Sequence, residues 1–283
     1  MKKVLIGGAT GYLGHYLVTE LKKRGYWIRA LARDAERLSD LYEYIDDVFE
    51  GEVTKPESLT GICDGIDIVI SSIGITRQKD GVTYLDVDYQ GNKNLLDLAI
   101  QENISKFLYI SVINAHLMKD LKMIQAKERF VDELKTSKLD YGIIRPTGFF
   151  SDMLEFYQMA QKGTAYLIGN GENVINPIHG SDLAEICANS ITSDKKEINI
   201  GGPDKYTFRQ VAELAFKVQN KKARISCLPL WVIRLLLPFM KLFTSSKTYG
   251  PIEFMTSIMT MDVIGDTYGN KKLEDFFASQ VAG

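Results

Sequence analysis

The residues best placed to do chemistry are three glycines near the N-terminus, Gly8, Gly11 and Gly14. They follow a short apolar run, Val4–Ile6, that is long enough for a buried parallel strand, and apolar residues then recur at helical spacing up to Gly25. A glycine turn between a strand and a helix is the context of a dinucleotide-binding fingerprint. Without a Cβ, Gly8 and Gly11 let the backbone approach a pyrophosphate, and Gly14 lets the helix pack close to the strand. Because the helix N-terminus also offers unpaired N–H groups to phosphates, this turn predicts nucleotide binding.

A second candidate stands at the end of the next predicted strand, residues 27–32, where dinucleotide folds distinguish their cofactors. A carboxylate there hydrogen-bonds the ribose 2′-hydroxyl of NAD, whereas an arginine accommodates the 2′-phosphate of NADP. Ala32 occupies the position expected for the acid, and Arg33 follows it. We therefore favour NADP, with NAD as the alternative. The adjacent Asp34 leaves that alternative open, unless it caps the helix that follows.

Strands alternate with helices along the first half of the chain. Further strands are expected at residues 48–53, 67–72, 107–111 and 139–145, with a helix over 84–101. This alternation requires right-handed crossovers and a parallel sheet covered on both faces. The expected fold is α/β, a doubly wound parallel Rossmann-like sheet of seven strands. Residues 1–150 would form the NAD(P)-binding domain, and 151–283 a smaller C-terminal substrate lobe interleaved with the sheet.

Composition sets bounds on partners and compartment. Apolar residues make up 45% of the chain and charged residues 25%, as in ordinary globular proteins, and the net charge of −2 gives no reason to expect nucleic acid as a partner. Cys63, Cys187 and Cys227 lie far apart without metal-ligand spacing, so reduced thiols and no metal site are expected. Met1–Lys3 leads directly into the first strand without the apolar stretch of a secretory signal, and we expect a cytoplasmic protein.

The stretch GGATGYLG, residues 7–14, resembles the extended and atypical short-chain dehydrogenase/reductase superfamily, in particular its NAD(P)H-binding, NmrA-like and isoflavone-reductase-like members. Other matching phrases are VDYQGN at 87–92, IHGSDLA at 178–184 and EINIGGP at 197–203, so the resemblance covers roughly residues 2–218. It implies a cofactor site that runs through the glycine turn, the adenine edge, the segment beneath the ribose and the nicotinamide side. The residues implied are Gly8, Thr10, Gly11, Tyr12, Leu13, Gly14, Arg33, Glu52, Val53, Ser71, Ser72, Ile73, Gly74, Lys127, Pro146, Thr147 and Phe149.

Two of these implications carry alternatives. Glu52 replaces the aspartate usual in the family, and the segment around it reads equally well as a turn into a short helix. Either Phe149 or Phe150 would stack on the nicotinamide ring while the other enters the core.

The resemblance also implies which residues do the chemistry. Its usual members use a serine, which orients the carbonyl, and a Tyr-x-x-x-Lys pair, in which the tyrosine transfers the proton and the lysine holds the ribose. Ser111 and Lys127 fit these positions, but Met123 stands where the tyrosine should be, and a thioether cannot donate a proton. Isoflavone-reductase-like members share this pattern, so Lys127 and Ser111 are the predicted catalytic residues. The alternatives are an exposed helical lysine and a strand-end serine, with His116 as a reserve proton donor.

The second half of the chain is less regular. Residues 166–168 and 173–178 look like two short strands around a turn, and residues 207–218 look like a helix with a capped start. Residues 228–243 are strongly apolar but contain Arg234, Pro238 and Lys241, and they fall short of the about 20 residues that span a bilayer. We first interpret this segment as a lid over an apolar substrate pocket. A membrane-surface helix and a subunit contact in a homodimer are the alternatives.

The expected function is that of an NAD(P)H-dependent oxidoreductase. It would pass hydride to a small apolar acceptor, conjugated or carbonyl-containing, without the usual catalytic tyrosine. The alternative is a non-catalytic NADP-sensing regulator or assembly factor of NmrA-like type, which Met123 favours. A sugar-nucleotide epimerase is disfavoured, because those relatives keep the tyrosine.

Overall fold

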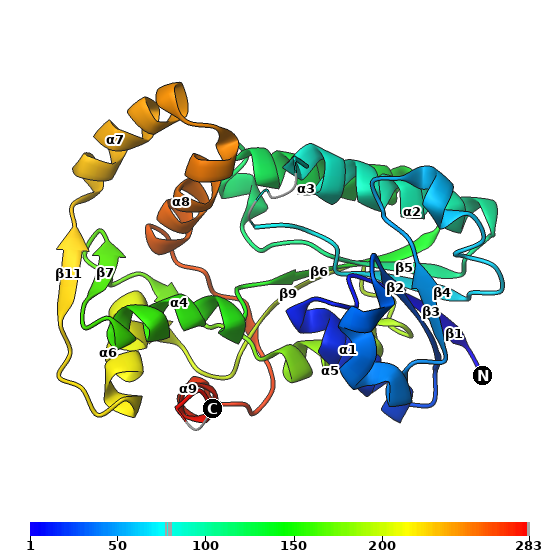
Figure 1. The fold of residues 1–283 in the computed structure, drawn as a ribbon, viewed down its shortest axis with the longest axis horizontal. Coiled ribbons are helices and arrows are strands. Elements are labelled where there is room, and N and C mark those ends of the chain that lie inside the picture. Colours follow the sequence, from blue (N-terminus) through cyan, green and yellow to red (C-terminus); the bar gives the residue numbers. More distant parts are fainter. Residues whose placement is uncertain (77, 79–80, 282–283) are drawn as a thin grey trace. The chain divides into compact units, whose positions relative to one another are not determined.

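The chain divides into two compact units in a computed structural model that describes residues 1–76, 78 and 81–281 (Figure 1). Unit 1 comprises Met1–Ala115, Lys122–Arg145 and Leu183–Ile198. Unit 2 comprises His116–Leu121, Pro146–Asp182 and Asn199–Gly283. The functional division at residue 150, between a cofactor domain and a substrate lobe, stays a prediction.

A parallel sheet of eight strands confirms the α/β class and the doubly wound Rossmann-like arrangement. The strand order is β12-β9-β6-β5-β4-β1-β2-β3. The prediction of seven strands is wrong, because β12 is a two-residue strand, too short to leave a periodic signal in the sequence. The strands are β1 (Lys3–Gly7), β2 (Trp27–Ala32), β3 (Asp47–Glu50), β4 (Ile68–Ser71), β5 (Lys106–Ile110), β6 (Asp140–Pro146), β9 (Glu197–Gly201) and β12 (Asp266–Thr267).

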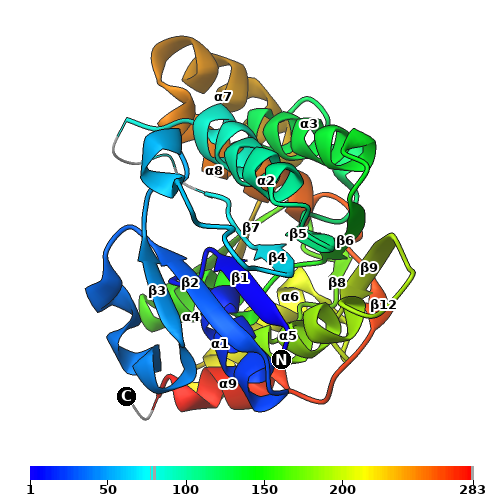
Figure 2. The same cartoon turned by 90° about the vertical axis from the view of Figure 1, so that its right-hand side faces the viewer.

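Helices cover both faces of the sheet in unit 1, which explains why its central strands are continuous apolar runs. α1 (Tyr12–Lys23) lies on one face, and α2 (Asn92–Gln101) and α3 (Lys122–Thr136) lie together on the other (Figure 2). The ring of Phe130 on α3 packs edge-on against Tyr109 of β5, with centroids 4.6 Å apart. This aromatic contact fixes α3 over the end of β5, one turn from Lys127. The connecting elements are η1 (Ala35–Tyr44), η2 (Pro56–Leu59), η4 (Ala115–Leu117) and α5 (Gly180–Ser190).

The helix predicted over residues 84–101 has two parts. Its first part, η3 (Leu85–Gly91), is a π-helix, and α2 continues from Asn92. The Asn92 amide donates to the carbonyl of Asp88 over 2.9 Å and accepts the hydroxyl of the buried Ser71. This side chain therefore competes for backbone groups inside the helix, which explains the widened turn. Such π turns are frequent at functional sites, and this one places Asp88 in the interior.

Unit 2 is built around three helices, α4 (Phe150–Gln161), α6 (Phe208–Val218) and α9 (Leu273–Ser279), joined by aromatic contacts such as Tyr157–Phe277 at 5.8 Å. Thr207 and Gln210 form a reciprocal capping box at the start of α6, which confirms the predicted capped start. The two strands expected around a turn exist, but each pairs elsewhere. β7 (Ala165–Ile168) pairs with β11 (Ile225–Leu228), and β8 (Val174–Ile175) pairs with β10 (Tyr206–Thr207).

The apolar segment of the second half forms α7 (Leu230–Phe243), which packs against α8 (Ser246–Met259). Pro238 lies inside α7. Within the described residues, none of the helices has the length and apolar content needed to cross a bilayer.

Candidate functional site

The glycine turn has a geometry that only glycine satisfies at two of its positions. Gly8 has a φ of +84°, and a Cβ there would lie 2.7 Å from the Ser72 hydroxyl. A Cβ on Gly14 would lie 2.1 Å from the Gly8 carbonyl oxygen, so Gly14 permits the close approach of α1 to the turn. α1 begins after Gly11, and in the described structure no side-chain capping hydrogen bond forms at that position. Of the other predicted turn residues, Leu13 is buried in the core, and Thr10 and Tyr12 are half-buried.

The segment after β4 lies against this turn. The Ser72 backbone N–H donates to the Gly7 carbonyl over 3.0 Å, and the Ser72 hydroxyl donates to the same oxygen over 3.1 Å. Ile73 is buried and lies next to Gly7. The structure thus brings the predicted diphosphate turn and the predicted ribose segment together, because β1 and β4 are neighbours in the sheet.

Lys127, on α3, lies against Gly74 at the end of the same segment. Its ammonium is 2.8 Å from Asp88 Oδ1, and the two side chains are 13% and 0% exposed. A Cβ on Gly74 would lie 2.6 Å from Lys127 Nζ and 2.8 Å from Asp88 Oδ1, so this glycine makes room for the pair. The alternative that Lys127 is an ordinary exposed helical lysine is wrong.

Tyr109 completes what we call the Lys127 cluster, formed by Lys127, Asp88 and Tyr109. The ammonium lies 5.7 Å from the centre of the Tyr109 ring. Among the described residues, Asp88 Oδ1 and the Tyr109 hydroxyl are the buried side-chain oxygens that lack a hydrogen bond, although Oδ1 faces the ammonium at ion-pair distance. Burial alone would lower the pKa of Lys127, but the Asp88 carboxylate and the Tyr109 phenol raise it above its ordinary value. Burial raises the pKa of Tyr109 to about 12, so at neutral pH the phenol keeps its proton and the ammonium keeps its charge.

Ser111 belongs to a different set of contacts, the Glu128 cluster of Glu128, Ser111, Arg145 and Glu197. The Ser111 hydroxyl donates to Glu128 Oε1 over 2.9 Å and accepts from Arg145 Nη1 over 3.2 Å. Arg145 holds Glu128 with two hydrogen bonds of 2.6 and 2.9 Å and donates to Glu197 over 3.1 Å. The only hydroxyl proton of Ser111 is therefore already shared with Glu128. The role of polarising an acceptor stays a prediction for this residue.

The position one turn before Lys127 is buried, since Met123 is 6% exposed. No proton donor is available from this side chain. Sequence reasoning missed Asp88 and Tyr109 as members of the site, although Asp88 lies in the VDYQGN phrase and Tyr109 stands two residues before Ser111. The reserve donor His116 is exposed on η4.

On the predicted adenine side of the site, Arg33 is an exposed cation, and Glu52 is a carboxylate whose partners lie in its own loop. Arg33 is exposed and, within the described ranges, has no hydrogen bond or ion pair. Asp34 caps η1 by accepting from the Glu36 N–H over 3.0 Å. Glu52 accepts from the Thr54 hydroxyl over 2.8 Å and pairs with Lys55 at 2.7 Å, and these hydrogen bonds, chiefly that from Lys55, lower the pKa of Glu52.

Hydrogen bonds within the protein therefore hold both Glu52 and Val53 in place, whether or not an adenine ring contacts them. The Val53 carbonyl accepts from the Asn94 amide over 2.7 Å. The short helix that the alternative interpretation expected after this turn is present as η2.

The predicted nicotinamide residues belong to unit 2. Pro146 and Thr147 are buried, and the Thr147 hydroxyl donates to the Asn176 carbonyl over 2.6 Å. Phe150 is the core member of the phenylalanine pair, with 2% of its surface exposed, whereas Phe149 is half-buried. Phe149 is thus the more exposed of the two.

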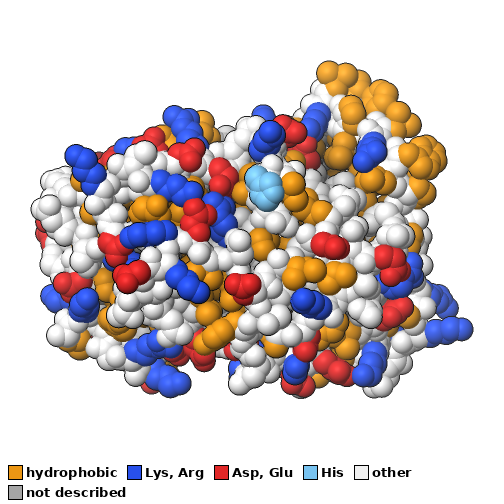
Figure 3. Space-filling view, turned by 180° about the vertical axis from the view of Figure 1, so that it is seen from behind, with side chains coloured by type: hydrophobic (Ala, Val, Ile, Leu, Met, Phe, Trp, Pro, Cys, Tyr) orange, Lys and Arg blue, Asp and Glu red, His pale blue; other side chains and the backbone are white. Residues whose placement is uncertain are grey.

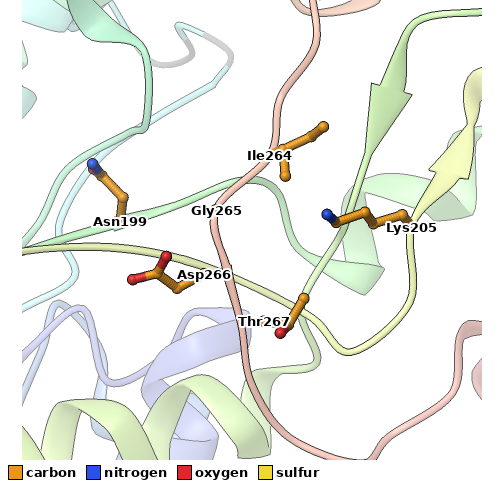
Figure 4. A pocket seen from close by; sticks show the side chains of 6 residues that line it. All are labelled: Asn199, Lys205, Ile264, Gly265, Asp266 and Thr267. Atoms are coloured by element: carbon orange, nitrogen blue, oxygen red, sulfur yellow. The ribbon is translucent and has the colours of Figure 1, made fainter.

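Unit 2 also contains two open, mainly polar hollows. The first, of about 470 Å³, is formed by side chains and backbone from β9, the residue before β10, and residues 264–267, which include β12 (Figure 4). The second, of about 640 Å³, includes Tyr206 and Glu274. Neither lining includes a residue predicted for the site. We assign no chemistry to these hollows.

Comparison with known proteins places this geometry in a family. Residues 8–194, more than half of the 283 residues, match the NAD(P)H-binding protein family. The chain is 26% identical over 245 residues to the photosystem II assembly factor Ycf39 of a Synechocystis strain, covering 85% of this chain and 75% of the relative. It is 27% identical over 322 aligned positions to the chloroplastic divinyl chlorophyllide a 8-vinyl-reductase of Arabidopsis thaliana, covering 98% and 76% of the two chains.

Among solved structures, the fold is similar to that of the NADPH-dependent quinone oxidoreductase QOR2 of Escherichia coli in complex with NADPH. The TM-score is 0.77 at 17% identity, over 98% of this chain and 99% of that one. At such identity the likeness shows the fold alone. The match over residues 8–194 confirms the resemblance to NAD(P)H-binding proteins: the chain belongs to the NAD(P)H-binding family.

Proposed function

We propose that this chain binds NADPH and passes its hydride to a small apolar acceptor that carries a conjugated carbon–carbon double bond or a carbonyl group. The observation that carries the proposal is the buried Lys127–Asp88 pair beside Gly74, in the segment predicted to run beneath the cofactor ribose. An ammonium at that place donates hydrogen bonds to ribose hydroxyls. Asp88 keeps the ammonium charged and fixes its position, so we assign Asp88 as a positioning residue for Lys127.

The rest of the cofactor site follows the predicted residues. The N–H groups at the start of α1, with the space left by Gly8, Gly11 and Gly14, would hold the diphosphate. The exposed Arg33, which forms no hydrogen bond or ion pair in the described part of the chain, would pair with the 2′-phosphate. NAD remains the alternative cofactor, in which case Arg33 has no phosphate to bind.

When bound, NADPH supplies the hydride. The residues of the chain bind and orient it, and Met123 leaves the reaction without the usual phenolic proton donor. A conjugated acceptor suits this arrangement, because it spreads the negative charge that it gains. The raised pKa keeps the Lys127 ammonium protonated, which favours ribose binding as the main role of this residue. If the ammonium gave a proton to the reduced acceptor, a solvent proton would replace it, because 13% of the side chain is exposed.

The names of two similar proteins support this acceptor class. One is named as a reductase of a vinyl group on divinyl chlorophyllide, and the other as an NADPH-dependent quinone oxidoreductase. Vinyl groups and quinones both offer conjugated double bonds.

A second candidate function is a non-catalytic NADP-sensing regulator or assembly factor. The buried thioether of Met123 favours it, and a similar protein is named as a photosystem II assembly factor. It predicts NADPH binding without NADPH oxidation. In either case we propose a cytoplasmic location and leave a homodimer contact as an alternative use of α7.

The test measures binding first and turnover second. Calorimetry with NADPH and NADH is expected to show tighter binding of NADPH. Arg33→Ala should weaken NADPH binding about tenfold, the worth of a charge-assisted hydrogen bond, and NADH binding less than twofold. Lys23→Ala removes an exposed cation at the other end of α1 and serves as the control.

Turnover is then followed as NADPH oxidation across a panel of enones, quinones, vinyl-substituted rings and aldehydes. Oxidation with conjugated members supports the reductase. Tight NADPH binding without oxidation by any member of the panel selects the regulator. Absence of binding to both nucleotides overturns both.

A further inference from the structure

The outward side of α7 is apolar to an extent that a folded chain rarely leaves uncovered. Ile233 is its one buried residue in the described structure. Six large apolar side chains are exposed, and we call them the α7 apolar face: Trp231 (68%), Leu235 (57%), Leu236 (49%), Phe239 (56%), Leu242 (75%) and Phe243 (78%). Hydrophobic side chains gather over α7 in the upper right of Figure 3, with Lys and Arg side chains among them. An exposed patch of this kind marks an interaction site.

The spacing of these residues makes a single face. Trp231, Leu235, Phe239 and Leu242 follow one another at intervals of four, four and three residues, which is one stripe of an α-helix. Arg234 and Lys241 also recur together, on a different side of the helix from that stripe. The helix therefore presents an aromatic and aliphatic face bordered by cations.

The sequence segment around α7 carries basic but no acidic residues. Residues 221–252 contain six Lys and Arg and no Asp or Glu, although the whole chain has 34 basic and 36 acidic residues. Within the part of the chain that the structure describes, Arg234 and Lys247 form no ion pair, whereas Lys241 pairs with Glu253. The surface that covers the α7 apolar face should therefore be negatively charged.

We propose that α7 is an interfacial helix that docks the protein on a bilayer containing anionic lipid. Trp, Phe and Leu on one side and Lys and Arg beside them are the composition of helices that lie in the plane of a membrane surface. With 14 residues, α7 lies on the bilayer rather than across it. A second copy of the chain fits less well, because a symmetric contact would bring the same acid-free segment against itself. This docking is independent of the proposed reaction.

The experiment uses the full chain and vesicles of stated composition. Co-sedimentation with phosphatidylcholine vesicles containing 30% phosphatidylglycerol is expected to capture the protein, and pure phosphatidylcholine vesicles to capture at least tenfold less. Leu242→Glu should lower the partition coefficient about tenfold or more, whereas Leu117→Glu, at an exposed leucine (60%) outside α7, should leave it unchanged. Arg234→Ala with Lys247→Ala should lower it about fivefold for each cation removed.

Fluorescence tests the same contact without a disruptive variant. Trp231 emission should shift to the blue on addition of the anionic vesicles, and Trp231→Phe should abolish the shift. Equal capture by both vesicle types, unchanged capture of Leu242→Glu, or absence of capture overturns the proposal. So does a dimer in sedimentation velocity, without lipid, that Leu242→Glu dissociates, since the occupant of the face is then a second copy.

Discussion

Two neighbouring clusters extend from consecutive residues of α3, and they differ in how completely their polar atoms are satisfied. In the Glu128 cluster, the Ser111 hydroxyl and both Glu128 oxygens have hydrogen-bond partners. In the Lys127 cluster, the Tyr109 hydroxyl is buried without a hydrogen bond among the described residues, and Asp88 Oδ1 is buried with the Lys127 ammonium 2.8 Å away.

The difference separates a structural network from a binding position. A buried polar group without a hydrogen bond costs free energy, so native proteins keep few of them, and a ligand is one reason to keep them. A saturated network has no donor left to offer. We therefore expect the Lys127 cluster to govern cofactor use and the Glu128 cluster to govern stability.

Replacing Lys127 should have the largest effect. Lys127→Met leaves the Asp88 carboxylate buried without its cation, which costs about 3–5 kcal/mol in the free energy of unfolding. If Lys127 binds the ribose and supplies the proton that the acceptor gains, NADPH oxidation should fall by about 10²-fold or more. Urea unfolding and the oxidation assay measure the two effects separately.

The control is the double variant Lys127→Met with Asp88→Asn, which replaces the ion pair by two neutral side chains. It should recover most of the lost stability, because no unpaired charge stays buried. Turnover should remain lost. Recovery of turnover in the double variant would mean that Lys127 serves only to neutralise Asp88.

Replacing Arg145 should produce the opposite pattern. Arg145→Met removes the guanidinium from Glu128 and Glu197, and the Arg145 side chain is 10% exposed. We expect a loss of about 2–3 kcal/mol, less than for a fully buried pair because both carboxylates still reach water. NADPH affinity, measured by calorimetry, should stay within twofold. A large loss of affinity in a folded variant would extend the site to the Glu128 cluster.

Ser111 gives a smaller test of the same contrast. Ser111→Ala deletes one hydroxyl between Glu128 and Arg145, and the loss should be about 1 kcal/mol. Since the hydroxyl proton is already shared with Glu128, NADPH oxidation should stay within twofold. A tenfold or greater drop in turnover at unchanged NADPH affinity would instead support the catalytic role predicted from the superfamily resemblance.

The sequence predicts the glycine turn well because two of its constraints are local. Gly8 must adopt a positive φ and Gly14 must admit a carbonyl oxygen, and both demands leave glycine as the direct sequence signal. Lys127 could be predicted from the residues around it on a single helix. Asp88 could not be assigned to it, because the two residues are 39 positions apart and meet only when η3 packs against α3.

Other differences between the predicted and the observed elements also come from contacts between residues far apart in the sequence. Strand β12 has two residues and forms only because β9 offers it an edge. Strands β7 and β8 were expected beside each other, but each pairs with a strand that comes later in the chain, and no local pattern identifies that partner. The π-helix of η3 depends on the side chain of Asn92, which meets Ser71 from another element.

The smallest expected effect concerns acid stability and the Glu128 cluster alone. Burial would raise the pKa of Glu197, but hydrogen bonds from Lys135 and Arg145 hold it below the ordinary 4.5. A carboxyl group with a lowered pKa contributes stability above the pKa of the unfolded chain and loses it as the pH falls through the folded value. Glu197→Gln should therefore reduce the free energy of unfolding at pH 6, and the difference from the parent protein should shrink below about pH 4.5. Urea titrations at pH 6, 5, 4 and 3 measure it. A difference that stays constant over this range would show that Glu197 contributes through packing rather than through its charge.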